Sequence, residues 1–216
     1  MDESRQYWKR QELANSVTHG LGIALSVAGL VVLVVLAGLH ATVWHVVSFS
    51  IYGASLILLY TSSTLYHSVH SPRLKRIFRI LDHSSIYLLI AGSYTPFVLV
   101  NLRGRWGWSL FGVIWALSLI GIFVKAFFTG RFKAVSTAVY LLMGWLVVIA
   151  IKPLAHAMPI GGIAWLLAGG LAYTLGAVIY LRKRIPYHHA VWHLFVLAGS
   201  ICQYFAVLLY VLPARV

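Results

Sequence analysis

The hydrophobic positions of this chain form long unbroken runs that are separated by short polar segments. Each run lacks Lys, Arg, Asp and Glu and holds roughly 20 residues, the length of an α-helix that crosses the hydrocarbon core of a membrane. The runs do not alternate apolar and polar residues with a period of two, which disfavours a transmembrane β-barrel. They fall at residues 20–39, 43–66, 83–102, 106–124, 134–151, 160–181 and 187–212.

Seven such runs predict an all-α integral membrane protein, a bundle of seven transmembrane helices. The composition agrees, because 61% of the 216 residues are hydrophobic and the mean hydropathy is +0.87, far above soluble domains. We expect a short N-terminal segment at residues 1–19 and one transmembrane domain at residues 20–213. Pro96 lacks a backbone N–H and is predicted to bend or locally unwind the third helix.

Small residues recur every four positions in the sixth run, at Ala168, Ala172 and Gly176. This spacing lets another helix approach closely and indicates helix packing. It permits association between copies of the chain but leaves the oligomeric state open. The single cysteine, Cys202, excludes a disulfide within one chain.

Basic residues are distributed unevenly over the two sides of the predicted membrane. In a soluble protein the net charge of +13 would suggest nucleic acid as a partner. Here, thirteen of the 17 Lys and Arg residues fall on the side of the N-terminus, and four fall opposite, at Arg103, Arg105, Lys152 and Arg215. The positive-inside rule then predicts a cytoplasmic N-terminus and an outside C-terminus in a multi-pass protein of the plasma (inner) membrane. The charge indicates topology and attraction to membrane lipids, and we expect no nucleic-acid binding.

Polar residues on three helices share the depth of the predicted cytoplasmic face. His189 and His193 are four residues apart at the start of the last run, so both imidazoles point from one helix face. Ser63 and His67 have the same spacing at the end of the second run. Asp82, the only acidic residue after the N-terminal segment, begins the third. An ionisable residue entering a membrane helix is a candidate functional residue.

Three neutral imidazoles with an open fourth position are typical of a catalytic zinc site, in which the carboxylate would hold a water. The alternative is that these histidines only bond headgroups or backbone at the interface. The convergence of three helices favours the metal for His67, His189 and His193. We assign the interfacial interpretation to the remaining isolated histidines, His40, His45, His70, His83 and His156.

Three ordered motifs resemble the hemolysin III group of bacterial membrane proteins, part of the progestin and adiponectin receptor (PAQR) family. They are E-x-x-N-x-x-x-H as "ELANSVTH", S-x-x-x-H followed by D-x-x-x-I as "STLYH" and "DHSSI", and H-x-x-x-H as "HAVWH". Any one of them is a weak signal. Together they extend from near the start of the chain to its last helix, which makes the set specific.

The resemblance implies a seven-helix bundle with a zinc ion at the cytoplasmic side, bound by His67, His189 and His193. It also implies a water held by Asp82. The wider superfamily is thought to include alkaline ceramidases, which implies cleavage of lipid amide bonds. Asp82 would then act as general base and pass its proton to the leaving amine, while Ser63 would orient the site or steady the oxyanion.

The first motif places Glu12, Asn15 and His19 on one helical face. These residues either complete a network behind the site or cap the first membrane helix, and we favour the structural role. The N-terminal segment is only about 19 residues long. We therefore do not transfer hormone binding from the animal receptors.

Two other function classes stay open beside the lipid hydrolase. In a non-enzymatic receptor or membrane-homeostasis sensor, a structural zinc would take Asp82 as its fourth ligand, so the distance from Asp82 to the metal distinguishes the two. A cytolysin is less favoured, since pore-forming toxins are usually soluble before insertion. A retinal-binding pump is excluded because residues 185–214 contain no lysine.

Overall fold

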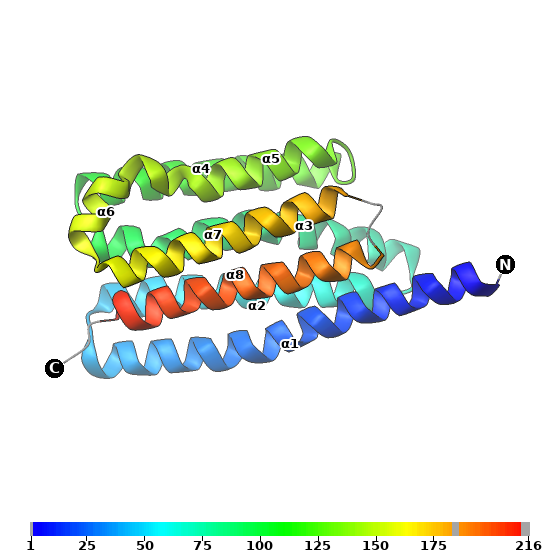
Figure 1. Ribbon diagram of the computed structural model, residues 1–216, viewed down its shortest axis with the longest axis horizontal. Coiled ribbons are helices and arrows are strands. Elements are labelled where there is room, and N and C mark those ends of the chain that lie inside the picture. Colours follow the sequence, from blue (N-terminus) through cyan, green and yellow to red (C-terminus); the bar gives the residue numbers. More distant parts are fainter. Residues whose placement is uncertain (1, 183–185, 213–216) are drawn as a thin grey trace.

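The computed structural model describes residues 2–182 and 186–212 and consists of α-helices joined by short turns. Seven helical segments are long and apolar enough to cross a membrane, which confirms the all-α, seven-helix prediction. The helices are α1 (Asp2–His40), α2 (Val43–Ser68), α3 (Pro72–Pro96), α4 (Arg105–Phe128), α5 (Lys133–Gly144), α6 (Ile151–Ala157), α7 (Ile160–Leu181) and α8 (His188–Tyr210). Figure 1 shows them aligned along one long axis.

The first helix is much longer than its apolar run. Helix α1 has 39 residues, so that residues 2–19 and the predicted first span form one continuous helix. In Figure 1 its N-terminal turns project beyond the other helices. We call this end of the molecule, where α1, α3, α5 and α8 begin, the N-terminal end of the bundle.

Two spans contain irregular turns. A π-helical turn, η1 (Phe97–Asn101), follows Pro96 at once, as expected where a proline cannot donate the next backbone hydrogen bond. The fifth span is composed of α5, a 3₁₀ turn η2 (Trp145–Ala150) and α6. The Tyr94 hydroxyl stabilises η2, because it donates to the Gly144 carbonyl oxygen at 2.8 Å and accepts from the Val147 N–H at 2.8 Å.

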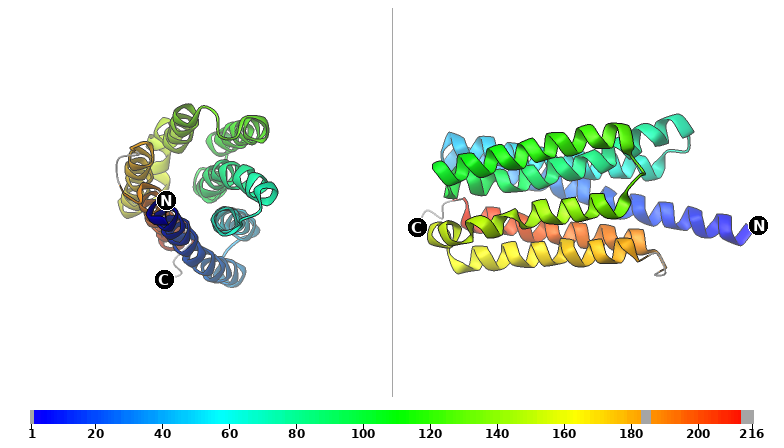
Figure 2. Two further views of the ribbon diagram at one scale, coloured as in Figure 1. Left: turned by 90° about the vertical axis from the view of Figure 1, so that its right-hand side faces the viewer. Right: turned by 90° about the horizontal axis from the view of Figure 1, so that it is seen from above.

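The helices form a ring in which α1 packs along α2, α2 along α3, α3 along α4, and α7 along α8, while α1 also contacts α8 (Figure 2). Glycine allows the close approach of α7 to α8. A Cβ at Gly169 would lie 3.2 Å from the Gly199 carbonyl oxygen, and one at Gly176 would lie 2.6 Å from Phe195 Cβ. Gly176 was predicted in this role, whereas Ala168 is exposed, so the packing face differs from the predicted one.

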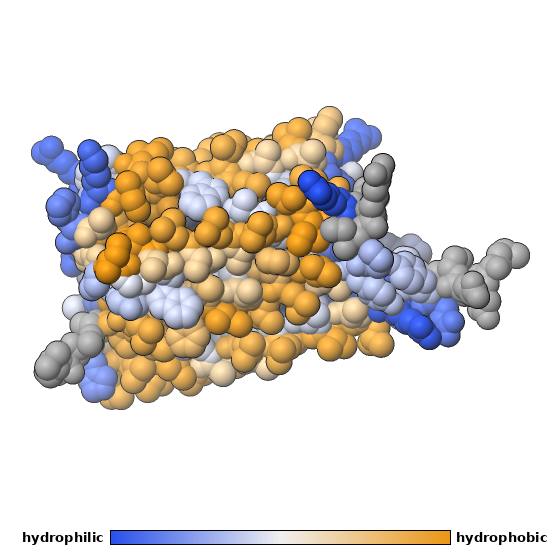
Figure 3. Space-filling model, viewed as in Figure 1, coloured by the Kyte–Doolittle hydropathy of each residue, from blue (hydrophilic) through white to orange (hydrophobic). Residues whose placement is uncertain are grey.

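The outer surface of the bundle is largely apolar, and polar residues gather at its two ends (Figure 3). Exposed leucine, valine, isoleucine and phenylalanine side chains cover the middle of the helices. This distribution suits a lipid environment, because a polar side chain facing hydrocarbon would lose its hydrogen bonds to water. Three of the basic residues used for the topology prediction, Lys183, Arg184 and Arg215, lie outside the described residues, as does the predicted domain end at residue 213.

Candidate metal centre

Three histidines meet inside the N-terminal end of the bundle. His67 lies in the last turn of α2, and His189 and His193 lie in the first two turns of α8. The Nε2 atoms of His67 and His189 are 3.2 Å apart. One ligand atom from each of the three side chains lies within 4.8 Å of the other two. The arrangement can therefore hold a metal ion, as predicted for these three residues.

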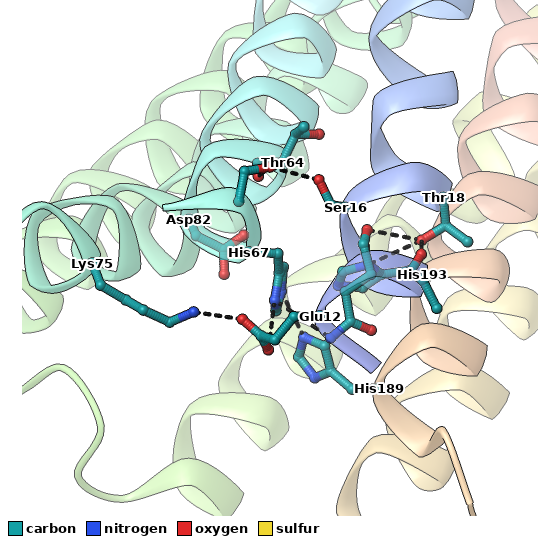
Figure 4. Close-up of polar contacts among 12 residues, drawn as sticks. Glu12, Ser16, Thr18, Thr64, His67, Lys75, Asp82, His189 and His193 are labelled. Atoms are coloured by element: carbon teal, nitrogen blue, oxygen red, sulfur yellow. Dashed lines mark hydrogen bonds and ion pairs between the residues drawn. The ribbon is translucent and has the colours of Figure 1, made fainter. Parts of the chain in front are cut away.

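Hydrogen bonds behind the cluster fix which imidazole nitrogens face inward (Figure 4). His193 Nδ1 lies 3.1 Å from the Asn15 carbonyl oxygen, an acceptor, so this nitrogen carries the proton and leaves Nε2 with its lone pair. His67 Nδ1 lies 3.3 Å from Glu12 Oε1 and 3.4 Å from the Asn15 amide nitrogen, and the shorter contact, with a carboxylate that can only accept, favours a proton on this nitrogen. Such partners orient histidine ligands and raise their basicity.

Glu12 is itself held in place from two sides. Its second oxygen, Oε2, accepts from the Lys75 ammonium at 2.5 Å. Lys75 also lies over the rings of Trp8 and Tyr66, at 5.2 and 5.1 Å from their centroids. Helix α3 thus fixes, through Lys75, the carboxylate of α1 that orients the His67 ring of α2.

His19 stacks on one ring of the histidine cluster. Its ring is parallel to that of His193 within 11°, with centroids 3.5 Å apart, and Tyr60 meets it edge-on. Both of its ring nitrogens are buried and have no hydrogen-bond partner among the residues that the structure describes. Because α1 begins at Asp2, His19 lies far inside that helix and cannot cap it. The preference for a capping role was wrong, and the network of Glu12, Asn15 and His19 behind the site is what the structure contains.

Asp82 and Ser63 lie next to the histidines. Asp82 is buried in α3, lines the same cavity as His189 and His193, and projects toward His67 in Figure 4. Its Oδ2 lies 3.5 Å from His83 Nδ1, so His83 belongs to this cavity and is not the isolated interfacial histidine that we predicted. The Ser63 hydroxyl is fully buried beside Asp82 and forms no well-aligned hydrogen bond.

The remaining histidines lie apart from the cluster. His40, His70 and His156 are exposed, which agrees with their assignment to the interface. His45 is buried and forms a reciprocal cap with Thr42 at the start of α2, where Thr42 Oγ1 and His45 Nδ1 are 2.9 Å apart. Sequence reasoning missed this cap, although Thr followed three residues later by a polar side chain is a known N-terminal signal.

The cavity beside the cluster continues into the apolar interior. It extends from His193 and Asp82 past Tyr173 and Tyr94 to Leu154, near the opposite end of the bundle, and its wall is mainly apolar. A chamber of this kind, with a few convergent polar groups at one end, is typical of a site for a mostly apolar ligand.

Comparisons with known proteins identify relatives whose matched region includes the residues of this site. The model of the haemolysin-III related family matches residues 7–204, which include every residue of the cluster and its network. Hemolysin-3 of Bacillus cereus is 51% identical over 204 residues, covering 94% of this chain and 93% of that protein. The Hemolysin-3 homolog of Bacillus subtilis (strain 168) is 49% identical over 201 residues, with 93% and 94% covered.

The human Monocyte to macrophage differentiation factor, a PAQR-type protein, is 29% identical over 203 residues, covering 91% of this chain and 83% of that protein. No solved structure matches the chain. The family match, the two bacterial relatives and the seven membrane-spanning helices lead to one conclusion: this chain is a multi-pass membrane protein that belongs to the haemolysin-III related family.

Proposed function

We propose that the three histidines bind zinc and that the protein hydrolyses an amide bond in a membrane lipid. The observation that carries the proposal is the convergence of three imidazoles at the polar end of an apolar cavity, with acceptors behind the Nδ1 atoms of His67 and His193. In a tetrahedral zinc site with Zn–N bonds of 2.0–2.1 Å, ligand nitrogens lie roughly 3.3 Å apart. The 3.2 Å between His67 and His189 fits this value.

The donor set favours a catalytic site over a structural one. A closed structural zinc site takes four protein ligands, whereas a catalytic one takes three and keeps a position for water or substrate. Within the part of the chain that the structure describes, the cluster has three donors and Asp82 is not among them. A set of three donors supports the hydrolase. It disfavours the alternative, a receptor or membrane-homeostasis sensor with Asp82 as the fourth zinc ligand.

Zinc, when bound, would supply an activated water and polarise the amide carbonyl. Asp82 would hold that water, take its proton as the water oxygen bonds to the amide carbon, and give the proton to the amine as the C–N bond breaks. The Ser63 hydroxyl, buried without a firm partner, would donate to the developing oxyanion. Glu12 would keep the His67 ring oriented.

Metal analysis tests the site itself. Purified wild-type protein should contain about one zinc per chain, and a variant with His67, His189 and His193 all replaced by alanine should contain none. The matched control replaces three exposed histidines, His40, His70 and His156, and should keep its zinc. A folded wild-type protein that binds no zinc even when zinc is supplied would refute the proposal.

We also propose that the N-terminal end of the bundle, and so the site, faces the cytoplasm. Basic residues of α3 and of the turn between α4 and α5 lie at this end, as the positive-inside rule requires. In a Cys202→Ser background, a cysteine replacing Ser71 should resist a membrane-impermeant maleimide in intact cells, whereas one replacing Arg103 should react. The reverse pattern would overturn the orientation.

A further inference from the structure

A lysine is buried in the wall of the cavity. Lys125, near the end of α4, is only 3% exposed, and it lines the cavity together with Asp82 and His83. Its ammonium donates to Ser136 Oγ of α5 at 2.5 Å. Lysines near the end of a membrane helix normally extend outward to the headgroups. Lys125 is turned inward instead.

The charge of Lys125 has no carboxylate to balance it. Among the described residues, Glu12 pairs with His67 and Lys75, and Asp82 pairs with His83, so neither of these carboxylates pairs with Lys125. The Ser136 hydroxyl accepts one hydrogen bond but supplies no negative charge. A lysine is almost never fully buried without an opposite charge, so the arrangement lacks a counter-ion.

Two more cations lie near this part of the cavity, Arg79 beside Lys125 and Lys133 in the cavity wall. Arg79 of α3 is close enough to Lys125 for their charges to repel, and its guanidinium lies against Gly130 in the turn between α4 and α5. Lys133, at the start of α5, lines the cavity beside Gly130. Two lysines of the cavity wall, from α4 and α5, thus have an arginine of α3 close to one of them.

We propose that Lys125, Arg79 and Lys133 bind the phosphate group of an acyl lipid whose chain occupies the apolar part of the same cavity. A phosphate carries more charge than a carboxylate and offers three acceptor oxygens, which suits several cations near one part of the cavity. The apolar walls of the cavity account for the chain. The assignment of the ligand as a lipid rests on the proposed function, because the proposed substrate and this ligand would occupy the same cavity. The phosphate site would narrow the substrate class to phosphate-bearing lipids.

The test measures binding without turnover. Native mass spectrometry would compare dioleoyl phosphatidic acid, dioleoylglycerol with the same chains but no phosphate, and inorganic phosphate alone. Wild-type protein should bind phosphatidic acid at least about tenfold more tightly than dioleoylglycerol. Equal affinity for the two lipids would overturn the phosphate site. Inorganic phosphate that binds as tightly as phosphatidic acid would overturn the assignment to a lipid.

Variants localise the effect. Lys125→Met keeps the length of the side chain, removes its charge and should weaken phosphatidic acid binding about tenfold, while Lys125→Arg should keep it. Arg131→Met removes an exposed cation from the same turn and controls for general attraction to the surface. Equal losses in Lys125→Met and Arg131→Met would overturn the site.

The histidine triple variant separates this site from the metal centre. Replacing His67, His189 and His193 by alanine should abolish zinc binding yet leave the preference for phosphatidic acid intact. Conversely, Lys125→Met should keep about one zinc per chain. If the wild type binds no zinc but still prefers phosphatidic acid, the proposed hydrolase fails and the phosphate site stands.

Discussion

The two sides of the cavity differ in how their polar groups are satisfied. On the side of α1, α2 and α8, the outward nitrogens of His67 and His193 have acceptors in Glu12 and Asn15, and only the inward positions remain. On the side of α3, α4 and α5, Lys125 has a hydroxyl partner but no counter-charge. The histidine side therefore offers ligand atoms to a cation, whereas the Lys125 side has a positive charge that an anion from outside the chain would balance.

The largest effect should come from Asp82, the buried carboxylate of α3 beside the histidines. Asp82→Asn keeps the shape of the side chain but cannot take a proton, so lipid amide hydrolysis should fall about 100-fold or more while zinc stays bound. Turnover and metal content, measured on the same preparation, check this. His70→Gln, at an exposed histidine outside the cluster, serves as the control and should retain full activity. Unchanged turnover in Asp82→Asn would refute the role of Asp82.

The next effect concerns the carboxylate behind His67. Glu12→Ala removes the acceptor at His67 Nδ1 and should lower zinc affinity about 10- to 100-fold, as removal of such partners does in other metal sites. Glu12→Gln keeps an acceptor and should lose less. Competition with a chelator of known affinity measures both. Identical affinities in all three proteins would mean that the histidine side needs no support from α1.

Helix packing gives a smaller effect. Gly176→Ala would place a Cβ 2.6 Å from Phe195 Cβ on α8, the helix that carries His189 and His193, and should lower the free energy of unfolding by about 1–3 kcal/mol. Gly112→Ala, where nothing lies within 4 Å, is the matched control and should be neutral or slightly stabilising. Chemical denaturation in detergent measures the difference, which must exceed that of the control.

The smallest expected effect concerns Lys125 and tests directly whether the two sides of the cavity differ. Lys125→Met removes a buried charge that lacks a counter-ion, so in lipid-free protein it should leave the free energy of unfolding unchanged or raise it by up to about 1 kcal/mol. Added phosphatidic acid should stabilise the wild type more than the variant. A marked loss of stability in the lipid-free variant would show that the Lys125 side, like the histidine side, is satisfied within the chain.

The sequence predicted the elements and the histidines for physical reasons that act locally. Long runs without charge indicate membrane helices wherever they occur, and the spacing of His189 and His193 fixes a shared helix face. Pro96 predicted an irregular turn because proline lacks a backbone N–H, and this disturbs a helix whatever other helices surround it. Helix direction brings the three histidines to one depth, and they lie close enough together to hold a metal ion, as predicted.

What the sequence did not predict depends on how helices rotate against one another. Glu12 and Asn15 reach the site because α1 is turned toward the ends of α2 and α8, which periodicity does not specify. Lys125 was counted only as a charge at the membrane face, since its inward direction depends on α3 and α5. The glycine face of α7 was shifted from the predicted one because contacts with α8 select Gly169 and leave Ala168 outside.

Helix α1 is longer than a membrane is thick and has no break along its length. At 1.5 Å per residue its 39 residues extend about 58 Å, nearly twice the thickness of a hydrocarbon core of about 30 Å. The helix is unbroken from its projecting first turns to its far end, and Glu12, Asn15 and His19 lie along it where it meets the histidine cluster. Because Glu12, Asn15 and His19 share one continuous helix, a shift of α1 along or about its axis would move all three side chains relative to the histidines of α2 and α8.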